Sequence, residues 1–264
     1  MTTPQYEVYA IKYAHHARRA AENFIGGDPH DGPMPLDFFV WLIRSTDGKV
    51  AREIVVDTGF SAATAARRQR NHLRCPTEGL GLLNSDSKKI KDVVITHLHY
   101  DHVGNFELFP AAIFHLQDLE MNYATGRHMA QPVFRGAFDV EDVVGMVRNT
   151  YAGRVKFHDG DAQLAPGVSV HLIGGHTMGL QVVRVATRRG WVVLASDASH
   201  FYANMEQVRP FPIVYSVADM VEGYARLRAL ADSPGHIIPG HDPLVLERYP
   251  APSGALAGVV ARLD

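Results

Sequence analysis

The sequence predicts a mixed α/β fold in which two β-sheets pack face to face and helices cover the outer faces. The chain has two strand-rich halves, about residues 1–150 and 151–264, and each half ends in helical segments. Strands follow one another before any long helix, which favours mixed sheets over a purely parallel sheet. We expect one domain over residues 1–264, because this length suffices for a single large core shared by both halves.

In the first half, short apolar or alternating runs predict strands. Their ranges are 6–13, 36–45, 53–56, 92–95 and 112–116. Serine caps, alanine-rich stretches and helical spacing of apolar residues predict helices. Their ranges are 61–70, 77–83, 118–123 and 140–151, and a further helix is expected to open at Gly104. Glycine and proline predict irregular segments at 26–33 and 124–138.

The second half changes rhythm, with successive apolar runs separated by glycine, aspartate and proline. These runs predict strands at 155–158, 168–173, 180–186, 191–196 and 236–239. An amphipathic pattern predicts a helix at 218–231.

Composition excludes several classes of protein. The formal net charge is −2 and no long basic run is present, so no nucleic-acid partner is expected. No apolar stretch approaches about 18 residues, so no membrane-spanning helix is expected. The first residues lack the pattern of a secretory signal, which favours a cytoplasmic location. Cys75 is the only cysteine, which excludes an intrachain disulfide, and exposed edge segments make a homodimer an alternative to a monomer.

Four residues of metal-ligating type follow the strand at 92–95 within six positions: His97, His99, Asp101 and His102. Imidazole and carboxylate groups suit zinc and its first-row neighbours. In a regular strand, His102 would face away from the other three, but a turn at 100–103 would let all four point inward. The alternative is a histidine-rich surface loop.

The same residue types recur at three later strand ends, each beside a glycine or a turn: His176, Asp197 and His241. Taken singly, each could cap a turn or lie on the surface. Four separate loops of this kind favour a metal centre.

Together these motifs resemble the metallo-β-lactamase superfamily, whose HxHxDH motif is matched by residues 97–102. The resemblance covers most of the chain and implies a four-layer αββα sandwich with two divalent metal ions at one edge. It implies that His97, His99 and His176 hold one ion, that Asp101, His102 and His241 hold the other, and that Asp197 bridges them. Zinc is expected, with manganese, iron or cobalt as alternatives. Asp57, in a turn after residues 53–56, is a candidate acceptor for a ligating imidazole or a purely structural turn residue.

Within the superfamily, the chain is most similar to the N-acyl-homoserine lactonase group. His99 stands where diiron flavoproteins carry glutamate, and Asp197 stands where exported antibiotic-hydrolysing enzymes carry cysteine. The lactonases commonly have a tyrosine three residues after the bridging aspartate, where this sequence has His200. We therefore expect His200, or alternatively Tyr202, to hold the substrate carbonyl, and Asp101 to accept a proton.

The expected reaction is attack of metal-bound hydroxide on the carbonyl of a lactone ring, either an acyl-homoserine lactone or a small or aromatic lactone. The partner would be a small cyclic ester or amide. The alternatives are hydrolysis of a lactam, imide or thioester at the same centre, and a non-hydrolytic iron redox protein.

Residues from irregular segments are candidates for the substrate pocket, with core packing as the alternative for each apolar one. They are His15, His16, Phe24, Met34, Met129, Phe134, Phe138, Phe201 and Met205. The histidine-rich stretch that continues to His30 and Asp31 could overhang the metals, or it could be a solvated loop or an arm exchanged between subunits.

Overall fold

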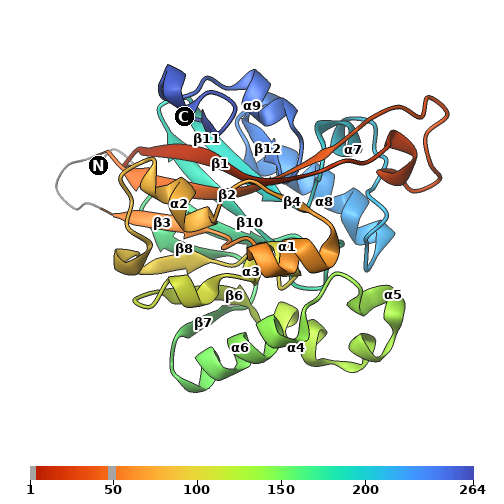
Figure 1. Cartoon of the computed structure of the whole chain (residues 1–264), viewed down its shortest axis with the longest axis horizontal. Helices are drawn as coiled ribbons and strands as arrows, with labels where there is room; N and C mark the ends of the chain where they lie inside the picture. The colour runs from red at the N-terminus through yellow and green to blue at the C-terminus, as the bar shows by residue number, and fades with distance from the viewer. Residues whose placement is uncertain (1–3, 47–51) are drawn as a thin grey trace.

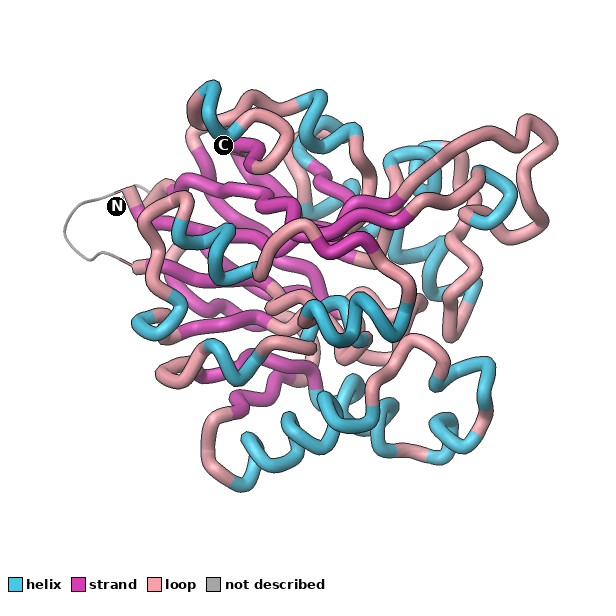
Figure 2. Tube along the Cα trace, in the orientation of Figure 1, coloured by secondary structure: helices cyan, strands magenta, loops and turns pink. Residues whose placement is uncertain are grey.

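A computed structural model describes residues 4–46 and 52–264. Two β-sheets pack face to face, and helices cover their outer faces, as the sequence predicted (Figures 1 and 2). The first sheet has the strand order β13-β1-β2-β3-β5-β6-β7, with β4 paired to the end of β1. Its strands are β1 (Tyr6–His16), β2 (Leu36–Ser45), β3 (Glu53–Val56), β4 (Asn71–His72), β5 (Asp92–Val94), β6 (Ile113–Gln117), β7 (Val155–His158) and β13 (Val260–Arg262).

The second sheet has the order β12-β11-β10-β9-β8. Its strands are β8 (Ala162–Ala165), β9 (Val168–Leu172), β10 (Gln181–Thr187), β11 (Gly190–Ser196) and β12 (Ile237–Pro239). The helices are α1 (Ala62–Arg68), α2 (Pro76–Gly81), α3 (Tyr100–Val103), α4 (Asp118–Thr125), α5 (Pro132–Arg135), α6 (Val140–Tyr151), α7 (Tyr202–Glu206), α8 (Val217–Leu230) and α9 (Leu244–Arg248). Among the described residues, no helix is long and apolar enough to cross a bilayer.

Strand β2 shows how the layers are built. Phe38, Val40 and Leu42 belong to the core beneath the helices of the first sheet, whereas Phe39 and Trp41 belong to the core between the two sheets. Both faces of the strand are therefore buried, which explains why its sequence is a continuous apolar run rather than an alternating one. Helix α8 lies on the far side of the second sheet. Its buried residues Met220, Tyr224 and Leu227 belong to the same apolar cluster as Phe39 and Trp41.

The strand directions place several carboxyl ends at one edge. Strands β3, β5 and β6 are parallel to one another, and β11 is parallel to β12. Loops that follow β3, β5, β11 and β12 therefore meet where the two sheets come together. This is the edge that carries the candidate ligands.

Several element boundaries match the prediction, namely those of β2, β3, α6 and β7. Ser61 caps α1 as expected, accepting a hydrogen bond from the Thr64 amide at 3.2 Å. The predicted helix at Gly104 is wrong: α3 lies just before this glycine, and only a 3₁₀ turn (Phe106–Leu108) follows it. Strand β1 is longer than predicted, because its pairing with β2 continues to His16.

Candidate metal centre

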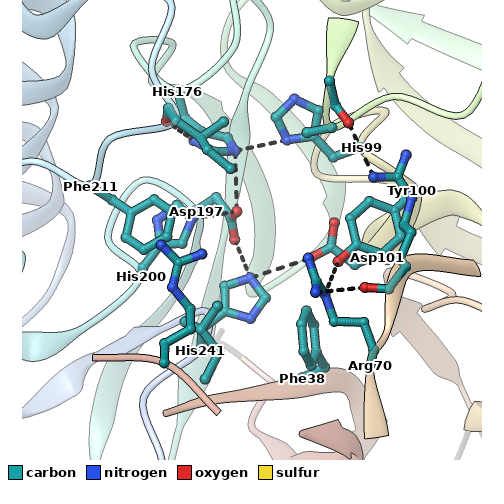
Figure 3. Close-up of a pocket in the computed structure, with 16 residues that line it drawn as sticks. Phe38, Arg70, His99, Tyr100, Asp101, His176, Asp197, His200, Phe211 and His241 are labelled. Carbon is teal, nitrogen blue, oxygen red and sulfur yellow. Dashed lines mark hydrogen bonds and ion pairs between the residues drawn. The ribbon is translucent and has the colours of Figure 1, made fainter. Parts of the chain in front are cut away.

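All seven predicted ligands come together at the shared edge of the sheets. His97 and His99 lie in the loop after β5, and α3 carries Asp101 and His102. His176 follows β9, Asp197 follows β11, and His241 follows β12. Figure 3 shows His99, His176, Asp197, Asp101 and His241 turned toward a common centre. The short helix α3 supplies the turn that brings His102 to the same side as the others.

Three imidazoles form the first half of the site. The distance from His97 Nε2 to His99 Nδ1 is 3.0 Å, and that from His99 Nδ1 to His176 Nε2 is 2.9 Å. Ligand nitrogens around a tetrahedral zinc ion, each bonded at about 2.0–2.1 Å, would lie roughly 3.3 Å apart. The distances between these three nitrogens are thus close to those between ligand atoms around one bound ion.

Asp197 connects this group to the second half of the site. Its Oδ2 lies 3.2 Å from His176 Nε2, whereas its Oδ1 lies 2.9 Å from His241 Nε2 and 3.4 Å from His102 Nε2. Asp101 completes the second group, with Oδ2 at 3.6 Å from His102 Nε2. One carboxylate therefore presents one oxygen to each group, as a bridging ligand does.

The outward-facing nitrogens of three rings are fixed by hydrogen bonds. His102 Nδ1 lies 2.7 Å from Asp57 Oδ2, His176 Nδ1 lies 2.7 Å from the Ile213 carbonyl, and His241 Nδ1 lies 2.9 Å from the Asp37 carbonyl. These acceptors favour the tautomer with a proton on Nδ1. The Nε2 lone pair of each ring is then free to face the centre.

The buried polar groups fit a cation. His102 Nε2 and Asp197 Oδ1 are fully buried and have no well-oriented hydrogen-bond partner in the described part of the chain. Burial, and then the neighbouring imidazoles, lower the pKa of His97 and His99, so both rings are neutral ligands near pH 7. Burial opposes protonation of His102, but the carboxylates of Asp197 and Asp101 raise its pKa well above the ordinary value. A metal ion would supply the positive charge that these carboxylates otherwise draw from a proton.

Asp57 is the imidazole acceptor that the sequence suggested. Besides His102, its carboxylate accepts hydrogen bonds from the Thr96 amide at 2.7 Å and the Thr96 hydroxyl at 2.9 Å. Its backbone has a φ of 61°, a left-handed conformation that aspartate and asparagine tolerate better than most residues. The turn after β3 therefore has two roles: Asp57 holds Thr96 in place, and it orients the candidate ligand His102.

Glu120 was not identified from the sequence, although it ties two ligand loops together. This buried residue of α4 accepts hydrogen bonds from the Leu98 amide at 2.8 Å, the Thr177 hydroxyl at 2.6 Å and the Gly179 amide at 3.1 Å. It thus fixes the loop of His97 and His99 against the loop of His176. Its only sequence signal was an acidic residue flanked by Leu119 and Met121.

A pocket of about 130 Å³ opens above the ligands. Arginines and apolar side chains surround it. They include Arg18, Arg68, Arg70, Leu36, Phe38, Tyr100, Phe211 and Ile213. None of these eight residues was predicted, because they come from β2, α1, α3 and loops that only the tertiary structure brings together.

A larger cavity of about 770 Å³ shares Arg68 and Gly136 with the ligand pocket. Met129 and Phe138, both predicted pocket residues, line this second cavity. The Phe138 ring also packs edge-on against His99, with ring centroids 4.6 Å apart. The two residues therefore lie beside the ligand pocket rather than in it.

The other predicted pocket residues lie elsewhere. Phe24, Phe201 and Met205 are buried, and Met34 and Phe134 pack against the core. His15 binds Asp37, whereas Asp31 is exposed and binds Arg19, and His30 is also exposed. None of these residues, nor His16, lines the ligand pocket. Composition shows that a segment is irregular but not which way its side chains point.

His200 does line the pocket, but it also contacts Asp197. Its Nε2 lies 3.0 Å from Asp197 Oδ2, and its ring stacks on Phe211 with centroids 3.7 Å apart. Burial lowers the pKa of His200 to about 3, so the ring is neutral at pH 7. Tyr202, the alternative candidate, is buried in the core with Arg248 over its ring.

Comparisons with known proteins agree with this geometry. Residues 38–241 match the family model of the metallo-beta-lactamase superfamily. The N-acyl homoserine lactonase AttM of Rhizobium johnstonii is 30% identical over 238 residues, covering 82% of this chain and 85% of that protein. A quorum-quenching N-acyl homoserine lactone lactonase has a similar structure, with a TM-score of 0.74, 21% identity and coverage of 91% and 93% of the two chains. AidC, a dizinc quorum-quenching lactonase, gives a TM-score of 0.68 at 16% identity, with coverage of 91% and 89%.

Proposed function

The chain belongs to the metallo-beta-lactamase superfamily, and we propose that it is a metal-dependent hydrolase that opens a lactone ring at two divalent ions. One observation carries the proposal. Asp197 directs Oδ2 to the group of His97, His99 and His176, and Oδ1 to the group of His102 and His241. This arrangement suits two ions that share one carboxylate, since a shared anion offsets their mutual repulsion.

The residues present fit such ions in number and type. His97, His99 and His176 would hold one ion, Asp101, His102 and His241 would hold the other, and Asp197 would bridge them. A ligand set of imidazole nitrogens and carboxylate oxygens suits zinc, and also manganese, iron or cobalt. When bound, such ions lower the pKa of water toward neutrality and polarise a carbonyl oxygen.

The protein's own groups organise the rest of the site. Phe38 and Phe211 line the pocket beside the ligands and give it an apolar wall (Figure 3). Asp101, which lines the pocket with 11% of its side chain exposed, is placed to take up a proton as the ring opens. His200 holds Asp197 Oδ2 at 3.0 Å and thereby fixes the orientation of the bridging carboxylate.

Relatives support a lactone as the substrate. AttM, which the chain matches at 30% identity over most of its length, is an N-acyl homoserine lactonase. One solved N-acyl homoserine lactone hydrolase, at 20% identity and a TM-score of 0.73, carries its product N-hexanoyl-L-homoserine at the catalytic metal center. We extend the opening of a lactone ester to this chain, without specifying the acyl group of the substrate.

The test combines metal analysis with a pH-indicator assay on a panel of lactones. We expect about two zinc ions per chain and release of acid from at least one lactone class. Asp197→Asn should lose at least one ion and nearly all activity, whereas Asp219→Asn, an exposed change on α8, should keep both. Full activity of the metal-stripped protein, or two bound ions with every lactone inert, would contradict the proposal.

A further inference from the structure

Three arginines converge at the mouth of the ligand pocket. Arg18 comes from the segment between β1 and β2, which projects from the sheet at the right of Figure 1. Arg68 ends α1, and Arg70 directly precedes β4. Figure 3 shows Arg70 on the Tyr100 and Asp101 side of the pocket.

These three side chains differ from their sequence neighbours in having no acidic partner. Arg19 pairs with Asp31 and Arg67 pairs with Asp139, both on the surface. Within residues 4–46 and 52–264, no carboxylate forms an ion pair with Arg18, Arg68 or Arg70, whose hydrogen bonds go to neutral acceptors instead. The pocket mouth therefore holds three guanidinium groups that form no direct ion pair with any carboxylate that the structure describes.

Neutral contacts hold two of the guanidinium groups in place. Arg18 donates from Nε to the Asn23 side chain at 2.8 Å and from Nη2 to the Glu22 carbonyl at 2.6 Å. Arg70 donates from Nε to the Tyr100 hydroxyl at 3.1 Å and from Nη1 to the Arg68 carbonyl at 2.7 Å. In the described structure this leaves Arg18 Nη1 and Arg70 Nη2 without an acceptor, although both groups are already oriented.

The segment that carries Arg18 is itself anchored. Asn204 donates a hydrogen bond to the Asn23 carbonyl at 3.1 Å, and Arg209 binds Asp28 at 2.9 Å. The Arg18 guanidinium lies 5.0 Å from the centre of the Phe211 ring, which itself lines the pocket. Burial lowers the pKa of Arg18 below its ordinary value. At this partly desolvated site, water screens the attraction between the guanidinium group and an anion less than it does at the surface.

We propose that Arg18 and Arg70 bind a carboxylate carried by the substrate, so that the preferred lactone is an acid rather than a neutral acyl-homoserine lactone. The inference rests on the proposed lactonase function and adds the charge class of the substrate. A carboxylate has two oxygens, one for each open Nη group, and planar guanidinium groups suit this geometry. A neutral lactone would leave both cations unpaired at a partly desolvated site.

The test uses matched pairs of substrates. One member of each pair is a γ-butyrolactone with a carboxylate attached to the γ-carbon, directly or through a short methylene spacer. The other member is the corresponding primary carboxamide. For the best spacer, kcat/KM of the carboxylate should exceed that of the carboxamide by roughly 10- to 100-fold. Most of the difference should lie in KM, since the arginines contact a part of the substrate that does not react.

Variants locate the source of this preference. Arg18→Gln and Arg70→Gln should each reduce the carboxylate-to-carboxamide ratio by about tenfold or more. Arg19→Gln changes the adjacent arginine, which is paired on the surface, and should leave the ratio unchanged. If both pocket variants keep the wild-type ratio, the carboxylate binds elsewhere, for example on the metal ions, and the inference is overturned.

A binding measurement separates this inference from the proposed function. Cyclopentanone carboxylates have no ester to hydrolyse, and calorimetry should show that they bind more tightly than their carboxamides and more weakly in Arg18→Gln. If lactones are opened with no preference for the acid, only the inference fails. If no lactone is opened, the lactonase proposal fails, and equal binding of both cyclopentanones would then also refute the arginine site.

Discussion

Replacing Asp57 by asparagine should weaken the second metal position while leaving the first intact. Asp57 Oδ2 accepts a hydrogen bond from His102 Nδ1 at 2.7 Å, and both side chains are buried. Asparagine keeps the shape and tolerates the φ of 61°. However, its amide would present an N–H group to His102 Nδ1, favouring the tautomer that carries its proton on the metal-facing Nε2.

The expected size follows from the loss of one charge-assisted hydrogen bond. Such bonds contribute about 1.5–3 kcal/mol, and removing the acceptor of a ligating histidine typically costs 10- to 100-fold in metal affinity. The two figures agree, since tenfold corresponds to about 1.4 kcal/mol. We therefore expect the zinc dissociation constant of the second position to rise by about 10- to 100-fold, while that of the first position stays the same.

Competition with a chromogenic chelator at pH 7.5 measures both dissociation constants, and a urea melt confirms that the variant is folded. Asp37→Asn is the matched control. Asp37 is also buried beside a candidate ligand histidine, but it binds His241 through its backbone carbonyl, which the substitution leaves in place. Two wild-type zinc affinities in Asp57→Asn, or equal losses in both variants, would refute the reasoning.

Three further changes test other parts of the structure. Burial lowers the pKa of His158 to about 4, below its unfolded value near 6.5. The unfolded chain therefore binds the proton first, and the free energy of unfolding should fall as the pH drops from about 6.5 to about 4. Urea unfolding of His158→Gln over this pH range should show a shallower decline. Gly179→Ala would place a Cβ 2.0 Å from the Glu120 amide nitrogen and should cost about 1–3 kcal/mol in the free energy of unfolding, whereas Gly81→Ala meets no atom within 4 Å and should not be destabilised. His200→Phe should bind both ions yet lower kcat about tenfold, because the bridging carboxylate loses a hydrogen bond; unchanged kcat with full metal content would assign His200 to packing.

The candidate ligands could be predicted because each lies just after a strand that its own residues specify. His97 to His102 are close in sequence, so the local pattern was enough, and β2 and β3 were bounded by clear changes in polarity. The short strands β4, β8 and β13 were missed. β4 is the polar pair Asn71–His72, and β8 holds a single large apolar residue, Leu164, so neither shows the apolar pattern of β3 or β7. β13 exists only because β1, at the other end of the chain, offers it an edge.

The pocket mouth could not be predicted for a different reason. In the sequence, Arg18 and Arg19 are equivalent, as are Arg67 and Arg68, yet one member of each pair enters the pocket and the other binds a surface carboxylate. The end of β1 and the end of α1 decide which member points inward. Those ends depend on pairing with β2 and β4, which is information held by distant parts of the chain.

The candidate ligands belong to both sheets, since residues 97–102 follow β5 of the first sheet and His176, Asp197 and His241 follow strands of the second. Ions bound between them would act as non-covalent cross-links across the seam where the sheets meet. A ligand that binds only the folded state, present at about 1,000 times its dissociation constant, adds about 4 kcal/mol to stability. Removal of metal should therefore loosen this seam before the rest of the core. Amide hydrogen exchange should then accelerate first in the four ligand loops, while the interior of β2 keeps its protection.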